Sequence, residues 1–129
     1  RDSFSDEKIL DILTFKNVPT GTSGGITLTG TLGSILGASI LVFSVWLFFP
    51  IYGELAYGII LCGILGATLD SILGASIQGK YQSINGSIIE IPEDGAILVQ
   101  GNKWVSNDMV NLLSTATAPL FMYLYLLYI

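Results

Sequence analysis

The chain contains no histidine and only one cysteine, Cys62, among its 129 residues. Without histidine it lacks the commonest general base and the usual zinc ligand, which argues against zinc chemistry and acyl transfer. A single cysteine cannot form an internal disulfide. The apolar neighbours of Cys62 indicate a small buried residue and not a reactive thiol.

Charged residues are also scarce, and basic residues are fewer than acidic ones. Charged side chains make up 12% of the chain, whereas soluble domains carry about 25%. Five basic residues against ten acidic ones give a net charge of −5, so the chain lacks the positive surface that binding of nucleic acid requires. The mean hydropathy of +0.69 indicates instead a protein whose partner is the lipid bilayer.

Three long apolar runs, residues 26–49, 55–78 and 109–129, are each able to cross a bilayer, which takes about 20 residues. They predict one all-α integral membrane domain over residues 1–129, with about three transmembrane helices and a multi-pass location (the cell membrane in a prokaryote). The chain starts at Arg1, and no signal peptide precedes the first run. We therefore expect the C-terminal part of a longer polytopic protein, whose N-terminal helices are its partners.

The middle apolar run, residues 55–78, carries a single ionisable side chain, Asp70, roughly 12 Å inside one end of the run. A carboxylate at the centre of a membrane helix costs about 2.5–3.5 kcal/mol. Gly66, Asp70, Gly74 and Gln78 are spaced by four, so they share one helix face that should point into protein. Because intramembrane acids are functional by default, we predict Asp70 as the catalytic residue. The alternative is a protonated or hydroxyl-bonded acid that joins two helices.

A glycine-rich stretch, GTSGGITLTG, covers residues 21–30, where a loop meets the first apolar run. Glycines let a backbone approach a ligand, and free N–H groups at a helix start favour anions such as phosphate. The predicted substrate-binding residues of this loop are Gly21, Thr22, Ser23, Gly24 and Gly25. No Walker-type GK[ST] follows, and such entries more often form plain turns, so both interpretations stay open.

Two connecting segments have patterns of their own. Residues 1–20 are amphipathic up to Pro19, which predicts a short helix on the membrane surface or else a simple linker. Residues 79–108 contain the alternating runs SIIEI and AILVQ around the turn PEDG. They predict a polar, hairpin-like loop that serves as a lid or as a solvated connector. Pro119 should kink the third span.

An internal repeat links the first two runs. Residues 28–40, LTGTLGSILGASI, resemble residues 65–77, LGATLDSILGASI, with Gly33 in the place of Asp70. Gly33 and Gly37 have the spacing that permits close contact between membrane helices. We expect the two small-residue faces to pack against each other.

The basic residues flank one side of the membrane, which by the positive-inside rule predicts that the N-terminal segment and the 79–108 loop are cytoplasmic. Antiparallel spans then bring the glycine-rich loop, the Asp70 face and the start of the third span to the same end. These features supply backbone N–H groups together with carboxylate and amide oxygens, which suit a Mg²⁺–phosphate group. The predicted metal ligands are Asp70 and Asp108, and the further substrate-binding residues are Gln78, Asn107 and Asn111.

Three motifs give the chain a family resemblance. They are Val18-Pro-x-Gly-Thr-Ser-Gly-Gly-Ile-Thr27, Asp70-Ser-x-Leu-Gly-Ala-x-x-Gln78, and Val105-Ser-Asn-Asp-x-Val-Asn111 with Ser114 beyond. In order and spacing the chain resembles the domain of unknown function 92 family of integral membrane proteins, which includes a phytyl-phosphate kinase. The resemblance implies transfer of a phosphoryl group from a nucleoside triphosphate, CTP by expectation, to a prenyl or phytyl monophosphate at the cytoplasmic face. The family also has an upstream acidic membrane motif that this chain lacks.

Two other functions remain open at this point. Asp70 suits the ion site of a lipid or ion transporter or carrier. The small-residue faces alone suit a non-catalytic membrane subunit.

Overall fold

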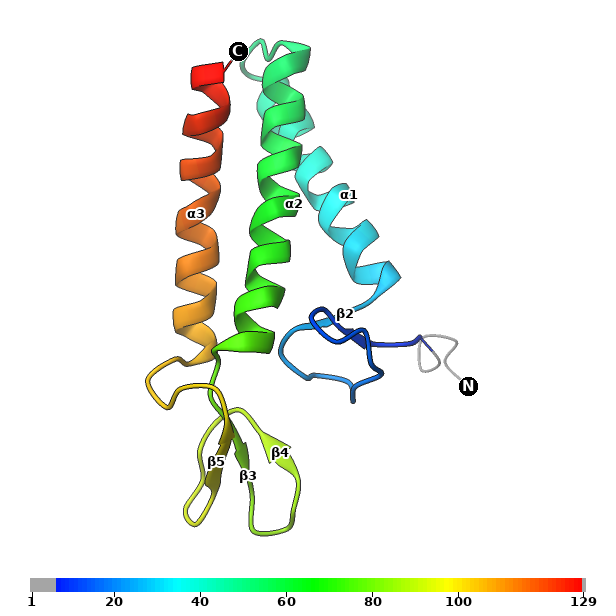
Figure 1. Ribbon diagram of the computed structural model, residues 1–129. Helices are drawn as coiled ribbons and strands as arrows, with labels where there is room; N and C mark the ends of the chain where they lie inside the picture. The colour runs from blue at the N-terminus through cyan, green and yellow to red at the C-terminus, as the bar shows by residue number, and fades with distance from the viewer. Residues whose placement is uncertain (1–6, 129) are drawn as a thin grey trace.

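The computed structural model describes residues 7–128, which are mostly helical (Figure 1). The helices are α1 (Leu28–Trp46), α2 (Gly53–Ser76) and α3 (Asn107–Tyr128). Each is long and apolar enough to cross a membrane, so the prediction of three spans is confirmed. The short strands are β1 (Leu10–Asp11), β2 (Gly25–Ile26), β3 (Lys80–Gln82), β4 (Ile88–Ile89) and β5 (Ile97–Gln100). They correct the all-α prediction, because two small sheets accompany the helices.

Helices α2 and α3 pack together along their length through small residues (Figure 1). A Cβ atom added to Gly58 would lie 2.6 Å from the Tyr125 ring, and one added to Gly66 would meet Ala118 at 3.7 Å. The Tyr125 hydroxyl donates to the Glu54 carbonyl at 3.0 Å. Close backbone approach is how membrane helices gain contact area.

Helix α1 approaches α2 at one end and diverges from it toward the loops (Figure 1). A Cβ atom on Gly63 would meet Ala38 at 3.3 Å, but atoms added to Gly33 or Gly37 would meet nothing within 4 Å. No residue of α1 is buried. The expected close packing of residues 28–40 on residues 65–77 is therefore wrong at the loop end, where the two helices stand apart.

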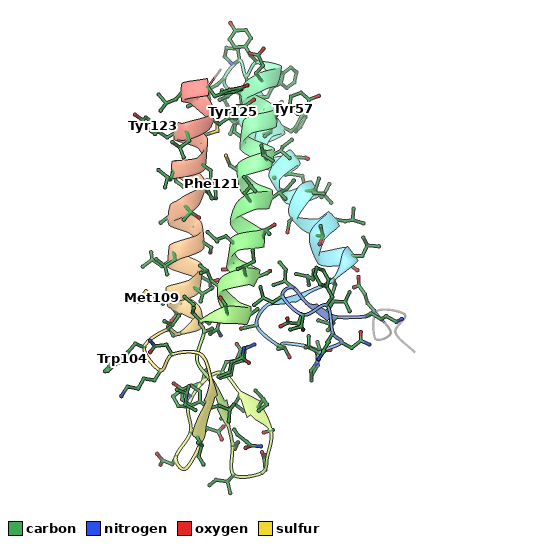
Figure 2. All side chains as sticks on the ribbon, in the orientation of Figure 1. Tyr57, Trp104, Met109, Phe121, Tyr123 and Tyr125 are labelled. Atoms are coloured by element: carbon green, nitrogen blue, oxygen red, sulfur yellow. The ribbon has the colours of Figure 1, made fainter. Side chains whose placement is uncertain are left out.

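Aromatic side chains gather at the two ends of the helices (Figure 2). Tyr57, Tyr123 and Tyr125 lie at the end remote from the sheets, and Trp104 lies at the end beside them. Tyr57, Tyr123 and Trp104 are exposed. This distribution matches the aromatic belts that membrane proteins place at the two lipid–water interfaces.

The predicted surface helix is wrong for the described residues 7–20, and its residues 1–6 lie outside the described range. In its place β1 pairs antiparallel with β2, with Leu10 opposite Ile26. Asp11 Oδ1 accepts hydrogen bonds from the N–H groups of Leu13 at 3.1 Å and Thr14 at 2.8 Å. The Thr14 bond is the main cause that lowers the pKa of Asp11. This side-chain-capped turn replaces the helical hydrogen bonds.

The segment between α2 and α3 forms a three-stranded antiparallel sheet, here called the polar sheet, in the order β4-β3-β5. Tyr81 lies opposite both Ile89 and Leu98. The predicted hairpin of the two alternating runs around PEDG is therefore wrong in its pairing, because β3 lies between them. The sheet projects beyond the loop end of the helices (Figure 1).

Both helices that start at the loop end are capped. The Thr27 hydroxyl accepts from the Gly30 N–H at 2.9 Å at the start of α1, and the Ser106 hydroxyl accepts from the Met109 N–H at 3.3 Å before α3. Such caps satisfy N–H groups that the first turn leaves free. Helix α3 continues through Pro119 as a single helix.

The N-terminal segment is tied to the start of α1 by a carboxylate. Glu7 Oε1 accepts from the Thr29 N–H at 2.7 Å, and the Thr29 hydroxyl donates to its second oxygen. These bonds lower the pKa of Glu7, and the bond from the Thr29 hydroxyl has the larger effect. A negative charge is also favoured at this helix end by the helix dipole.

Candidate functional site

The glycine loop, residues 21–25, lies directly on the last turns of α2. Gly24 is buried with φ +83°, and a Cβ atom there would lie 2.7 Å from the backbone of Ala75. A Cβ atom on Gly74 would lie 3.1 Å from the Gly24 nitrogen. The loop therefore needs glycine at position 24 both for its left-handed backbone and for the close approach to α2.

A cavity of about 390 Å³, here called the surface cavity, opens between this loop, the end of α2 and the start of α3. All five predicted loop residues, Gly21, Thr22, Ser23, Gly24 and Gly25, line it, together with Asp70, Gln78 and Asn107. The structure thus brings eight of the ten predicted site residues to one cavity. Asn111 and Asp108 are the two exceptions.

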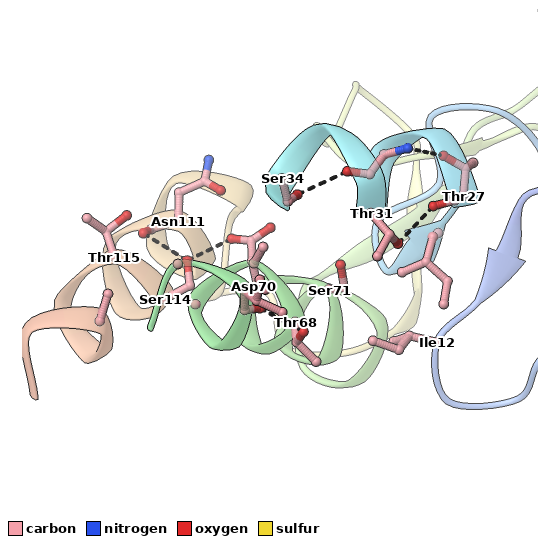
Figure 3. A pocket seen from close by; sticks show the side chains of 18 of the residues that line it. Ile12, Thr27, Thr31, Ser34, Thr68, Asp70, Ser71, Asn111, Ser114 and Thr115 are labelled. Atoms are coloured by element: carbon pink, nitrogen blue, oxygen red, sulfur yellow. Dashed lines mark hydrogen bonds between the residues drawn. The ribbon is translucent and has the colours of Figure 1, made fainter. Parts of the chain in front are cut away.

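A larger cavity of about 900 Å³, here called the helix cavity, lies between the three spans. Figure 3 shows Thr31 and Ser34 of α1 facing Asp70 and Ser71 of α2 across it, with Asn111 on α3. This is where the predicted residue Asn111 lies. The cavity exists because α1 diverges from α2 at the loop end.

Asp70 lies where the two cavities meet. Gly25, Thr27, Asp70 and Ser71 line both cavities. The Ser114 hydroxyl, on a side chain only 5% exposed, donates to Asp70 Oδ1 at 2.8 Å. Within residues 7–128 no hydrogen bond reaches Oδ2. The carboxylate thus joins α2 to α3 through one oxygen.

Glu90 is a residue of the site that sequence reasoning missed. It follows β4, and its Oε1 accepts from the Ser23 N–H at 2.7 Å while its Oε2 accepts from Gln78 Nε2 at 3.0 Å. The available signal was a lone acid within the alternating run SIIEI. A charged side chain in an alternating run ordinarily marks the solvent face of a strand, so this signal did not predict the contact with Ser23.

Two buried polar groups accompany this contact. Gln78 is 1% exposed, and its Oε1 is a buried side-chain oxygen without a hydrogen-bond partner within residues 7–128. Lys80 is 5% exposed and donates from Nζ to the Ser23 carbonyl at 3.0 Å. Buried polar atoms are nearly always paired, either within the protein or with ordered water or an ion.

The predicted metal ligand Asp108 is not brought to Asp70. It is exposed and lines neither cavity. Successive helical residues are about 100° apart, so Asp108 is turned away from the side that Asn107 presents to the surface cavity. Across the described range no group of three or more His, Cys, Asp or Glu could hold a metal ion. The side-chain carboxylates that line the surface cavity are those of Asp70 and Glu90, and amide oxygens are added by Gln78 and Asn107.

The family model described as integral membrane protein DUF92 matches residues 3–119. The chain is also similar to an uncharacterized membrane protein of Methanocaldococcus jannaschii, with 41% identity over 83 residues that cover 59% of this chain and 32% of that protein. It is similar to Protein PGR of Arabidopsis thaliana, with 30% identity over 129 residues that cover 85% of this chain and 42% of that protein. Protein VTE6, chloroplastic, of the same plant has 34% identity over 102 residues that cover 78% of this chain and 25% of that protein. The matches thus cover less than half the length of these relatives, and no solved structure matches the chain.

Proposed function

This chain belongs to the DUF92 family of integral membrane proteins, and from that premise we propose that its full-length protein is a nucleotide-dependent kinase of a prenyl or phytyl monophosphate. The chain itself is a multi-pass membrane segment with three candidate spans. One observation carries the proposal: Asp70 lies where a cavity at the loop end meets a cavity between the spans. A lipid phosphate has a charged headgroup and an apolar chain, and these two parts need the two different cavities.

The two cavities suit the two parts of such a substrate. The surface cavity is lined by the Ser23 hydroxyl and the Ser23 N–H, which are donors for phosphate oxygens, although the N–H is bonded to Glu90 in this structure. The Thr22 hydroxyl also lies there, but it donates to the Pro19 carbonyl at 2.8 Å. The helix cavity has apolar lining from Ile26, Ile64 and Ala118 as well as hydroxyls. It accommodates the first units of a prenyl chain, whose remainder extends between the helices into lipid.

The proposed reaction requires no general base. A phosphate monoester is largely dianionic at pH 7, since its second pKa is about 6. One of its oxygens attacks the γ-phosphorus of the nucleoside triphosphate, the bond between the β-phosphate oxygen and the γ-phosphorus breaks, and a nucleoside diphosphate leaves. The products are a prenyl diphosphate and the diphosphate of the donor nucleotide.

The oxygen donors of the surface cavity fit Mg²⁺, which prefers carboxylate and amide oxygens and shared phosphates. Asp70 Oδ2 accepts no hydrogen bond within residues 7–128, and in the same range Gln78 Oε1 is a buried side-chain oxygen without a partner. We propose that Asp70 holds the ion and that Gln78, Asn107 and Asn111 orient the substrate. The ion would offset the negative charge of the phosphates that must meet. CTP as the donor follows from the family resemblance alone.

The test is an assay of the full-length protein in nanodiscs with Mg²⁺, phytyl monophosphate and each nucleoside triphosphate in turn. The expected result is a prenyl diphosphate and one equivalent of nucleoside diphosphate, with CTP as the best donor and with no product after chelation of Mg²⁺. Absence of lipid diphosphate with every donor would contradict the proposal.

A second candidate is a transporter or carrier of a lipid or ion. It is favoured by the hydroxyl groups of Thr31, Ser34 and Ser71, which line the helix cavity beside Asp70. Substrate flux into proteoliposomes without nucleotide consumption would select this function over the kinase.

A further inference from the structure

The glycine loop already binds an anionic group, and that group belongs to the chain itself. Both carboxylate oxygens of Glu90 are engaged, one by the Ser23 N–H at 2.7 Å and the other by Gln78 Nε2 at 3.0 Å. A phosphate oxygen has the same charge and accepts the same hydrogen bonds. Glu90 and Ser23 are 67 residues apart in the chain, so the contact depends on how the polar sheet is placed.

A second observation indicates that these donors are meant for a ligand. Gln78 is 99% buried and lines the surface cavity, yet its Oε1 has no partner within residues 7–128. Glu90 can satisfy only the NH₂ half of this amide because a carboxylate is solely an acceptor. A ligand with a protonated or cation-bound phosphate oxygen satisfies both halves, which Glu90 cannot do.

We propose that Glu90 is an internal competitor for the phosphate group, and that the polar sheet closes the surface cavity through it when no phosphate is bound. A phosphate group takes the Ser23 N–H and the Gln78 amide, and Glu90 with β4 moves away. This proposal rests on the phosphate-binding part of the proposed function and does not require phosphoryl transfer.

Glu90 and phosphate cannot both occupy this position. They need the same two donors, and two negative groups in contact repel each other strongly away from bulk water. Lys80 does not remove the conflict, because its Nζ donates to the Ser23 carbonyl on the other side of the same residue. Lys80 thus keeps the glycine loop attached to the polar sheet when Glu90 leaves.

The polar sheet is built so that Glu90 can leave. Strand β4 has two residues and pairs only with β3. Ile88, two residues before Glu90, is 57% exposed, and Ile91, directly after it, is 79% exposed, while Ile89 between Ile88 and Glu90 is half-buried. Few buried contacts hold a segment of this kind, so its opening requires much less free energy than global unfolding.

The first test measures binding of inorganic phosphate to the full-length protein in nanodiscs by calorimetry, without nucleotide and without Mg²⁺. A competitor that occupies the site lowers the apparent affinity by the fraction of molecules that are closed. We therefore expect Glu90→Gln to bind phosphate about tenfold more tightly than wild type. Glu93→Gln is the matched control, since Glu93 is exposed and its Oε2 accepts from the Ser83 hydroxyl, and it should bind like wild type.

Several results of this titration would overturn the proposal. They are unchanged or weaker binding by Glu90→Gln, or no phosphate binding by either protein. Binding that requires Mg²⁺ in wild type and is lost in Glu90→Gln would instead make Glu90 a metal ligand. Repeating the titration with phytyl monophosphate and with CTP shows which phosphate displaces Glu90, the lipid headgroup or the nucleotide.

The second test needs no variant and so does not depend on how Glu90→Gln folds. Saturating phosphate should increase amide hydrogen exchange across residues 86–91 of the wild-type protein at least severalfold, while α2 stays unchanged. Unchanged or slower exchange in that segment would refute the competition. If exchange and affinity behave as expected but no diphosphate forms, the kinase proposal fails and this one stands.

Discussion

The two repeats, residues 28–40 in α1 and 65–77 in α2, have nearly the same sequence but different surroundings. Gly74 and Ala75 are buried under the glycine loop, whereas a Cβ atom on Gly37, the counterpart of Gly74, would meet nothing within 4 Å. No residue of the first repeat is buried, and it faces the helix cavity across from the second. A small-residue motif therefore permits close packing but does not cause it. The neighbours that the rest of the chain supplies decide whether it occurs.

The largest expected effect concerns the position where the repeats differ most, Gly33 against Asp70. Asp70→Asn keeps the shape of the side chain but removes the charge that would hold a cation. It should reduce phosphoryl transfer about 100-fold or more, because lost electrostatic stabilisation at a reacting phosphate is of that size. Radiolabelled diphosphate formation by the full-length protein measures this.

Asp108→Asn is the matched control for that experiment, because Asp108 is exposed and lines neither cavity. Its rate should stay within about twofold of wild type. If both variants lost activity equally, Asp108 would be a ligand after all. If neither did, Asp70 would only join α2 to α3 through Ser114.

The equivalent glycines should respond in opposite directions to the same substitution. Gly74→Ala places a methyl group 3.1 Å from a backbone nitrogen that cannot easily move, so it should destabilise the protein by about 1–3 kcal/mol. Gly37→Ala adds a methyl group in open space and should stabilise α1 by up to about 1 kcal/mol. Thermal unfolding in detergent compares the two. Equal changes at both positions would mean that the repeats share one environment.

A smaller effect is expected from the hydrogen bond that ties the second repeat to α3. Ser114→Ala removes the donor to Asp70 Oδ1 and should cost about 1 kcal/mol of stability, as such bonds do between membrane helices. The hydroxyl of Ser44 donates to the Ile40 carbonyl within its own helix α1, so Ser44→Ala should change the unfolding temperature little. A larger loss for Ser44→Ala than for Ser114→Ala would reverse this ranking.

The smallest effect concerns the start of the first repeat and depends on pH. The pKa of Glu7 is lowered by its bonds from Thr29. Its contribution is therefore complete above the ordinary glutamate value of about 4.3 and is lost as the pH falls through the lowered value. Glu7→Gln should speed amide exchange at residues 28–31 at neutral pH, and the difference from wild type should vanish only as the pH falls below the lowered pKa of Glu7. A difference that persists in acid would exclude the charge as its cause.

The spans were predictable from sequence because each is a long apolar run. Asp70 was singled out because it is the one charge inside such a run, and its catalytic role stays a prediction. The N-terminal segment was not. Its apolar positions fit a helical period, but Asp11 caps a turn and Leu10 pairs with Ile26 across the glycine loop. Pairing between distant residues overrode the local pattern, as it does for strands in general.

The same limit applies to the site. The glycine loop and Gln78 carry recognisable local signals, and the topology alone predicts that they share one end of the membrane. Glu90 reaches Ser23 because β4 lies beside β3. The turn signals around PEDG predict that β4 pairs with β5 and give no indication that β3 lies between them. The direction of Asp108 was likewise undetermined until the helix start was fixed at Asn107.

The most direct test of the account is an experimental structure of the full-length protein with a prenyl monophosphate bound. The predicted result places the phosphate in the surface cavity between the Ser23 backbone and Asp70, with the prenyl chain entering the helix cavity between α1 and α2. Glu90 should then be displaced from Ser23. A headgroup bound at the opposite end of the helices, or a lipid that leaves both cavities free, would contradict the account.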